Sequence, residues 1–527
     1  MSPSRVLAIA SADLRARLRR PGTLVFLALL LAAASTTFPD PSSGQGILTI
    51  GGRRAVYTSA ALAVATAGLL PILLGLFGFY AVSNAVALDR RSGAGRLFAA
   101  SPATNAEYLL GKLLGNVALL SVVTLAFSAV VMAVQVVHAE APLEPLVFLA
   151  HVLVVALPAV FAIAVFALLF ECVPFLAGRS GDVAFFFVWA VALALPVLLG
   201  DPESGRFPTY AAALDWNGLG FLITQIRRVT GSGSLTIGWG GAAAPGPPML
   251  FPGFSFSAAM LASRALAFLP PLALLPVALL AFDRFDPARR LASASTKASL
   301  LARVSAVFRP AAARLLSAAV PPERPAARPG LVAAALTDLL VTLRLRPLLV
   351  VALPLSATVA LFVPPGVARS LLSAAFALLA LLLADVGTRE ESTGLARVLA
   401  ATPGAGGRLA AVKLLSAAGA ALLLLVPLAA KTSAAHPLAL PAAVAGALFA
   451  AALAVTLGQA TGSPKPFVGL LLAAWYVAAN DGGRTPALDL AGFTGAATAA
   501  SIAGWLAGAA AVAAAALLLE RVRLARA

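Results

Sequence analysis

Charged residues are scarce in this sequence. Asp, Glu, Lys and Arg make up 11% of the 527 residues, whereas 61% are hydrophobic, and the mean hydropathy is +0.96. Soluble domains carry about 25% charged residues, because they must cover their surface with polar groups. The composition therefore excludes soluble globular and disordered chains and, despite 43 Gly and 37 Pro, a collagen-like one. It predicts an all-α polytopic membrane protein.

Residue types that hold metals or nucleotides are scarce as well. The single cysteine, Cys172, excludes an internal disulfide and a cysteine metal cluster. The three histidines form no paired-ligand pattern and are more typical of core or interface histidines; they are His138, His151 and His436. The sequence has no G-x-x-x-x-G-K-[ST] run and so predicts no phosphate-binding loop. We expect no catalytic residue, no metal site and no cofactor on this chain.

Long apolar runs fill most of the chain. A helix that crosses a bilayer needs about 20 mostly apolar residues. With a window of that length, the sequence predicts about twelve spans, at 22–38, 59–88, 113–137, 146–170, 183–199, 265–282, 348–364, 370–386, 414–430, 438–458, 466–480 and 497–519. The stretch 200–264 between two spans is predicted to be partly irregular, because it is rich in Gly and Pro.

The basic residues are distributed unevenly between the two sides of these spans. Lys and Arg exceed Asp and Glu by 38 to 21, which in a soluble protein would indicate nucleic-acid binding. With the N-terminus inside, 29 of the 38 basic residues lie on the inner side and 9 on the outer side. The positive-inside rule then predicts that both termini are cytoplasmic. The partner of this charge is therefore the lipid bilayer, not nucleic acid.

Two other inferences concern the setting of the chain. Its richness in Arg and Ala is typical of a GC-rich bacterial genome, so we expect a bacterial plasma (inner) membrane. A signal peptide is the alternative interpretation of the first 38 residues. The same pattern recurs in the middle of the chain, where a signal peptide makes no sense, and this recurrence favours a span.

The chain contains an internal repeat. Residues 89–114 align without a gap to residues 390–415, at an offset of 301. The matched pairs are Asp89 with Glu390, Gly93 with Gly394, Arg96 with Arg397, Ser101–Pro102 with Thr402–Pro403, and Lys112 with Lys413. Further matches flank the spans: Asp13 with Asp338, Pro21 with Pro347, Asp215 with Asp489, Gly218 with Gly492, and Asp283 with Glu520.

The repeat predicts two tandem six-span halves in the same orientation. We expect the first half, with the larger outer loops, at 1–283, a basic cytoplasmic linker at 284–330, and the second half at 331–527. Part of the linker could lie on the anionic inner leaflet as an amphipathic helix, or could be a solvated tether. Segments 5–20 and 331–346 place Arg among apolar residues before a span, which favours an amphipathic elbow helix over an ordinary basic flank.

The repeated inner segment is longer than a turn between two spans requires. It predicts a short helix that ends before Pro102 and Pro403, because the residue before proline resists helix. Alternatively, Ser101 and Thr402 cap the helices that lead into the next spans. A charged, inward element joined to two spans would suit contact with a cytoplasmic partner. The simpler alternative is a loop kept only for topology.

The order of these elements resembles an ABC-2-type ABC transporter permease, present twice on one chain. The run of Ser101, Pro102, Tyr108, Leu109, Leu110, Gly111 and Lys112 is similar to the inner loop of permeases grouped with multicopper-enzyme maturation systems. The second copy departs from this run at 409–412. The resemblance implies an exporter fold whose inner loops dock on separate ATP-binding cassette subunits, which bind ATP and Mg. It assigns coupling to the ten residues Asp89, Gly93, Arg96, Ser101, Pro102, Glu390, Gly394, Arg397, Thr402 and Pro403.

Two other classes of membrane protein are alternatives to this one. Twelve spans also fit a proton-coupled secondary transporter of major-facilitator type, but proton coupling usually needs ionisable residues deep in the spans. Asp385, Glu171 and Arg264 all lie near predicted span ends. A membrane enzyme lacks a cluster of catalytic residue types. For the substrate path, the polar residues that the sequence offers near the inner ends of the spans are Asn84, Asn116 and Gln459.

Overall fold

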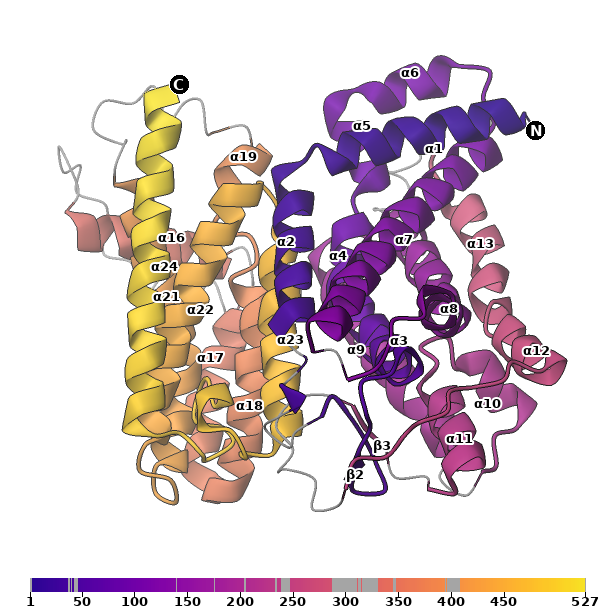
Figure 1. Ribbon diagram of the computed structural model, residues 1–527. Helices are drawn as coiled ribbons and strands as arrows, with labels where there is room; N and C mark the ends of the chain where they lie inside the picture. Colours follow the sequence, from indigo (N-terminus) through magenta and orange to yellow (C-terminus); the bar gives the residue numbers. More distant parts are fainter. Residues whose placement is uncertain are drawn as a thin grey trace. The chain divides into compact units, whose positions relative to one another are not determined.

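The computed structural model divides into two compact units, Met1–Ser293 and Ala294–Ala527 (Figure 1). The boundary falls inside the segment 284–330, which the sequence predicts as a linker. The structure describes residues 2–36, 38, 40–41, 46–138, 140–174, 176–202, 205–232, 235–237, 247–286, 310, 314, 330–344, 347–393, 395 and 408–526. All statements below concern these residues.

Helices make up nearly all regular structure of the first unit. They are α1 (Pro3–Leu18), α2 (Pro21–Thr36), α3 (Ser59–Leu73), α4 (Phe79–Val82), α5 (Ala85–Ser92), α6 (Ala94–Ala100), α7 (Asn105–His138), α8 (Pro145–Cys172), α9 (Arg179–Gly200), α10 (Thr209–Leu214), α11 (Leu219–Thr230), α12 (Ala258–Leu266) and α13 (Leu269–Ala281). A π-helical turn at Leu74–Gly78 joins α3 to α4. A small antiparallel sheet has the order β2–β1–β3, from β1 (Leu48–Ile50), β2 (Arg53–Arg54) and β3 (Leu235–Ile237).

The second unit is built from helices α16 (Leu331–Arg344), α17 (Pro347–Phe362), α18 (Pro365–Leu382), α19 (Arg389–Thr393), α21 (Leu409–Thr432), α22 (Ala439–Thr461), α23 (Lys465–Asp481) and α24 (Ala499–Arg526). A 3-10 turn, Pro486–Leu488, precedes α24. Helix α22 packs against α21 and α24. Its small side chains permit close approach, and the Gly387 backbone lies against Gly458 so closely that a Cβ on Gly458 would come within 2.7 Å of the Gly387 Cα.

Nine helical segments of the described chain are long and apolar enough to cross a membrane, by length and composition. They are Ser59–Ser92, Asn105–His138, Pro145–Cys172, Gly181–Gly200, Ala258–Ala281, Pro365–Leu382, Leu409–Thr432, Ala439–Thr461 and Ala499–Val522. The architecture is that of an all-α polytopic membrane protein. The other three predicted spans correspond to α2 and α17, with 16 residues each, and α23, with 17. The twelve-span topology therefore stays a prediction.

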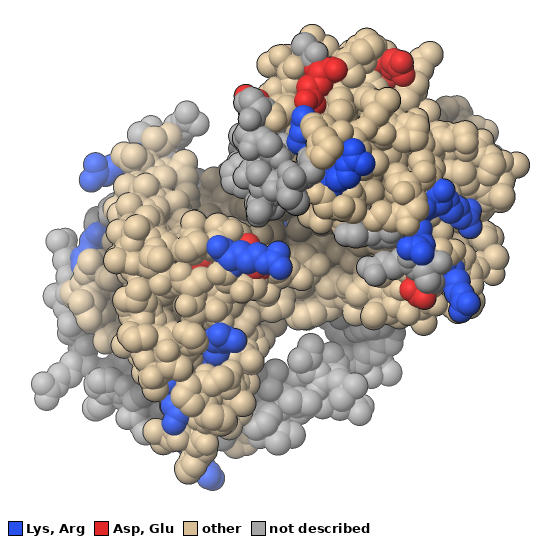
Figure 2. Space-filling model, turned by 60° about the horizontal axis from the view of Figure 1, so that its bottom comes forward, with Lys and Arg blue, Asp and Glu red and all other residues tan. Residues whose placement is uncertain are grey.

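The core of the first unit is formed by helices that are apolar all round. In α3, the residues from Ser59 to Gly68 are all buried, and the helix packs on α8 and α7. A helix that is apolar all round can be buried by other helices or face lipid, and α3 is buried by other helices. Helix α1 packs on α7 at the opposite end of the unit from the sheet (Figure 1). The end that carries the sheet is turned forward in Figure 2, where separate basic side chains stand on a mostly uncharged surface.

Candidate functional site

The first copy of the repeated loop, residues 89–112, folds into a helical corner. Helix α5 ends at Gly93, whose φ of +81° is a left-handed conformation that closes helices and favours glycine. Helix α6 follows at once. Its Arg96 and Leu97 side chains are exposed, with Leu97 76% accessible. An exposed large apolar side chain beside an exposed cation is suited to contact with another surface.

The predicted short helix before Pro102 is confirmed as α6, and Ser101 is its C-terminal cap residue. The alternative, that Ser101 caps the next helix, is wrong. The Ser101 hydroxyl donates to the Phe98 carbonyl (2.7 Å). Helix α7 begins later and is closed by a capping box: Glu107 accepts from the Thr104 amide (2.8 Å), and the Thr104 hydroxyl accepts from the Glu107 amide (3.2 Å). The Thr-x-x-Glu pattern at 104–107 is the sequence signal of this cap, and the prediction that Ser101 caps the helix missed it.

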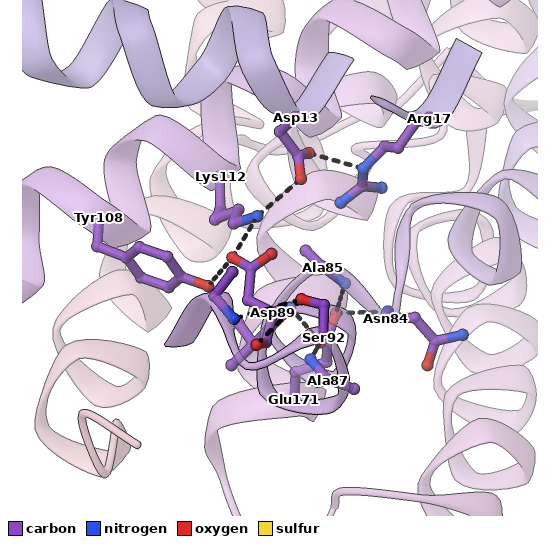
Figure 3. A network of polar contacts seen from close by, with 12 residues as sticks. Asp13, Arg17, Asn84, Ala85, Ala87, Asp89, Ser92, Tyr108, Lys112 and Glu171 are labelled. Atoms are coloured by element: carbon purple, nitrogen blue, oxygen red, sulfur yellow. Dashed lines mark hydrogen bonds and ion pairs between the residues drawn. The ribbon is translucent and has the colours of Figure 1, made fainter. Parts of the chain in front are cut away.

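A buried ion network joins this loop to α1 (Figure 3). The Lys112 ammonium lies 2.7 Å from an Asp89 carboxylate oxygen and 2.8 Å from an Asp13 carboxylate oxygen. Arg17 approaches the other oxygen of Asp13 at 2.6 Å, and the Tyr108 hydroxyl donates to Asp89 (2.7 Å). The side chains of Asp13, Arg17 and Lys112 are at most 5% exposed. Two anions face two cations, so the buried charge is balanced.

Two further arginine contacts lie beside this network, at Arg20 and at Arg17. Burial, followed by repulsion from Arg17, lowers the pKa of the Arg20 guanidinium at the turn into α2. The Arg17 guanidinium donates to the Val82 carbonyl at the end of α4 (2.7 Å). Arg17 thus ties α1 to the segment that leads into the loop.

Glu171 holds the first turn of α5. Its two carboxylate oxygens accept from the backbone amides of Asn84, Ala85, Val86 and Ala87 at 2.6–3.0 Å. An anion here satisfies amides that lack helical partners and interacts favourably with the helix dipole. The sequence placed Glu171 only near a span end, because nothing local indicates that the end of α8 lies against the start of α5.

The second unit repeats the acid–lysine pair. Glu390 lies 2.6 Å from the Lys413 ammonium, which also donates to the Val386 carbonyl. Asp338 of α16 pairs with Arg389 (3.3 Å). The residues matched at offset 301 therefore make the same contact in both units. Gly394, Arg397, Thr402 and Pro403 lie outside the described residues.

The three residues predicted along a substrate path lie in different elements. Asn84 precedes α5 with a φ of +96°, and its backbone amide is bound by Glu171. Asn116 in α7 is fully buried, its amide nitrogen lies 3.4 Å from the Ala164 carbonyl, and its Oδ1 accepts no hydrogen bond. Gln459 is buried near the C-terminal end of α22, in the second unit. Among the described residues, no group of three His, Cys, Asp or Glu side chains could hold a metal ion.

Comparison with known proteins gave no match: no family model, no curated protein and no solved structure matches this chain. The arrangement just described holds an exposed helix at one end of the first unit by buried ion pairs and backbone caps.

Proposed function

We propose that this chain is the membrane-spanning permease subunit of an ATP-driven, ABC-2-type exporter. Both halves of the pathway lie on one chain, and the substrate is unidentified. The observation that supports this function best is the duplicated inner loop, with its ion pairs Asp89–Lys112 and Glu390–Lys413. The loop presents α6, whose Arg96 and Leu97 are exposed, while the base of the loop is buried.

In this proposal, the ATP chemistry belongs to separate ATP-binding cassette subunits, which hold ATP and Mg. The chain is not an enzyme; it lies in a bacterial inner membrane as twelve spans with both termini in the cytoplasm. ATP binding would draw the two partner subunits together and displace the inner loops. The spans would then exchange between inward- and outward-facing states.

Purification of the intact complex from native membranes in mild detergent tests this function. We expect a nucleotide-binding subunit to copurify, and we expect ATP hydrolysis by the complex to depend on the chain. If no ATPase is recovered and the purified chain moves substrate under a proton gradient alone, the proton-coupled secondary transporter is the correct class.

A charge reversal tests the coupling assignment. Arg96→Glu together with Arg397→Glu should remove transport, because both loops would repel the surface that accepts them, while membrane insertion stays intact. Arg206→Glu, an exposed arginine at the other end of the first unit, is the matched control. Full transport by the double variant would refute the assignment.

A further inference from the structure

The chain that leaves the last helix of the first unit folds back onto the docking loop. We name Asp283, Arg284 and Phe285 the inner clasp. Asp283 pairs with Arg90 of α5 (2.9 Å) and accepts from the Phe285 amide (2.9 Å). The clasp follows α13 directly, since that helix ends at Ala281. It therefore joins α13 to the loop 89–112 over a very short stretch of chain.

Arg284 makes the largest number of polar contacts within the clasp. Its guanidinium donates to Asn105 Oδ1 (2.9 Å) and to the carbonyls of Ala103 (3.0 Å) and Ser101 (3.2 Å). These acceptors span the turn between α6 and α7. The guanidinium also lies 5.5 Å from the centre of the Phe98 ring in α6. A planar donor with five N–H groups suits three acceptors in one turn better than an ammonium would.

Phe285 fills the space beneath α6. Its ring makes edge contacts with Tyr108 (5.5 Å between centres) and Phe98 (6.2 Å). Gly95 is buried against it, and a Cβ on Gly95 would come within 2.5 Å of the Phe285 ring. The docking helix therefore needs a glycine at the point where the clasp touches it.

The backbone of the clasp is strained. Arg284 and Phe285 have φ values of +48° and +64°, in the left-handed region that non-glycine residues rarely adopt. Such a conformation persists only where its contacts hold it. The hydrogen bonds of Arg284 and the ring contacts of Phe285 are the contacts that offset this strain.

The second unit joins the same two elements by different chemistry. Glu520, which matches Asp283 in the repeat, accepts from the amides of Leu409 (3.1 Å) and Ala410 (3.2 Å) at the start of α21. Here Glu520, within α24, caps the helix that follows the loop, whereas Asp283 pairs with Arg90 in α5, before α6. The acid that the repeat matches therefore contacts the loop region in both units, but through different partners.

We propose that the inner clasp is a positioning element that fixes docking helix α6 to α13, so that displacement of α6 moves the last span of the first half. This inference rests on the proposed function, because it assumes that a partner pushes on α6. In this view Arg284, Phe285 and Gly95 set the direction in which the loop can move, while Arg96 and Leu97 meet the partner.

The first test measures the clasp without any partner. In a Cys172→Ser background, spin labels at Ala99→Cys in α6 and Leu269→Cys at the start of α13 report the distance between the two helices. Arg284→Ala should at least double the width of the distance distribution, because the turn that joins α6 to α7 loses three hydrogen bonds to the segment that follows α13. Arg206→Ala is the control and should leave the width unchanged. If Arg284→Ala does not fold, Arg284→Gln replaces it.

The second test measures coupling in the purified complex with its ATPase. Arg284→Ala should leave ATP hydrolysis close to that of the wild type and lower transport per ATP by about tenfold, a loss that a general destabilisation would not confine to transport. The swap Arg90→Asp with Asp283→Arg should raise transport above that of either single change.

The outcomes separate the two proposals. If a wild-type complex couples normally and Arg284→Ala leaves the distance distribution narrow, the clasp is not a positioning element, and the exporter function stands. If no ATPase copurifies but Arg284→Ala broadens the distribution, the exporter function fails, and only the link between α6 and α13 survives. If the distribution broadens while transport per ATP is unchanged, the clasp has a structural role alone, and the inference is overturned.

Discussion

Lysine is rare in this chain, and the two lysines of the repeated loops are buried. Lys112 and Lys413 are 4% and 1% exposed, and each contacts a carboxylate of its own inner loop. A charge can remain buried only if its partners offset the lost hydration. Removal of either ammonium therefore affects more than one contact, because the carboxylates that it neutralised stay behind.

We predict that Lys112→Met and Lys413→Met each lower the free energy of unfolding by about 3–5 kcal/mol, since Asp89 and Glu390, whose side chains are only 19% and 16% exposed, would lose their cation. Unfolding in mixed micelles, followed by tryptophan fluorescence, measures the change. Lys431→Met is the control, because within the described part of the chain Lys431 makes a single polar contact, to the Leu361 carbonyl at an exposed site. Equal stability of Lys112→Met and Lys431→Met would show that the network contributes nothing to stability.

A second residue-scale prediction concerns Arg54 and Glu140. Arg54 binds both oxygens of Glu140 (2.7 and 2.9 Å), and this hydrogen bonding lowers the pKa of Glu140 below its usual value of 4.5. A lowered carboxyl pKa contributes stability that is present above the unfolded-state pKa and is lost as the pH falls through the folded-state pKa. The contribution of Glu140 to the thermal unfolding midpoint in detergent should therefore be constant above about pH 5. It should decrease as the pH falls below about 5.

The matched variant for this pH prediction is Glu140→Gln. It should be less stable at neutral pH by about 2 kcal/mol, because it loses a charge-assisted bidentate pair. It should also lose less stability than the wild type between pH 5 and pH 3. Parallel pH profiles for the two proteins would contradict the role of Glu140.

At the residue scale, the sequence predicted positions but not pairings. The offset of 301 matched Asp89 with Glu390 and Lys112 with Lys413, yet the acid and the lysine of one loop are 23 positions apart, and no local pattern shows that they meet. They meet because α5 and α6 form a corner that brings α5 back beside α7. Glu171 was missed for the same reason, since its partners lie more than 80 residues away.

At the scale of elements, the corner between α5 and α6 depends on one glycine. Gly93 has a φ of +81°, and a Cβ there would meet no atom within 4 Å, so a substitution costs backbone strain but creates no clash. We predict that Gly93→Val lowers the free energy of unfolding by about 1–2 kcal/mol, the cost of a left-handed non-glycine residue. It should also abolish coupling, because α6 leaves its position.

Gly52 offers a matched control for this prediction. It has a φ of +76° and an equally open surrounding, but it lies in the hairpin between β1 and β2. Gly52→Val should cost a similar amount of stability and leave transport per ATP unchanged. Equal transport by Gly93→Val and Gly52→Val would mean that the α5–α6 corner is not a coupling element.

Element prediction succeeded where hydropathy carries the signal and failed where packing decides. Long apolar runs predicted α7, α8, α21 and α22 well, and Arg-containing segments before spans predicted α1 and α16. The sequence did not predict α10 and α11 within the stretch 200–264, where helices alternate with Gly- and Pro-rich turns. The three-stranded sheet was also missed, because strands of two or three residues are too short to show a period.

The two units resemble each other in the turns that follow Asp215 and Asp489 as well as in the repeated loops. Asp215 accepts from the amides of Gly220 and Phe221, and Asp489 accepts from those of Thr494, Ala496 and Ala497. Each acid is followed three residues later by a glycine with positive φ, Gly218 or Gly492. A Cβ would clash with Val155 in the first unit and with Ala439 in the second. The matched sequence positions thus cap corresponding turns in both units.

The side of the membrane on which each end of the chain lies distinguishes a protein with nine spans from one with twelve. An odd number of spans puts the two ends of the chain on opposite sides of the membrane, and an even number puts them on the same side. The apolar runs predict twelve spans, and the asymmetry of 29 to 9 basic residues counted on them predicts that both ends lie inside. In that arrangement α2, α17 and α23 cross the bilayer although they have only 16 or 17 residues. Short spans are tolerated where the bilayer thins or flanking side chains snorkel.

Single cysteines introduced in a Cys172→Ser background test this topology. A membrane-impermeant maleimide is added to spheroplasts, whose inner membrane is intact and exposed to the reagent. Cysteines at Arg15 in α1 and Val522 in α24, both exposed, should react only after permeabilisation. Arg53, which follows α2, and Phe362, the last residue of α17, should react at once, because each lies across one short helix from the predicted inner side. Reaction at Arg15 and Arg53 on the same side would show that α2 does not cross. Whether the two loops share a side depends on the helices between them, which include α17 but not α2. Reaction at Phe362 only after permeabilisation would show that α17 does not cross, and would place the two loops on opposite sides and remove the proposed symmetry of docking.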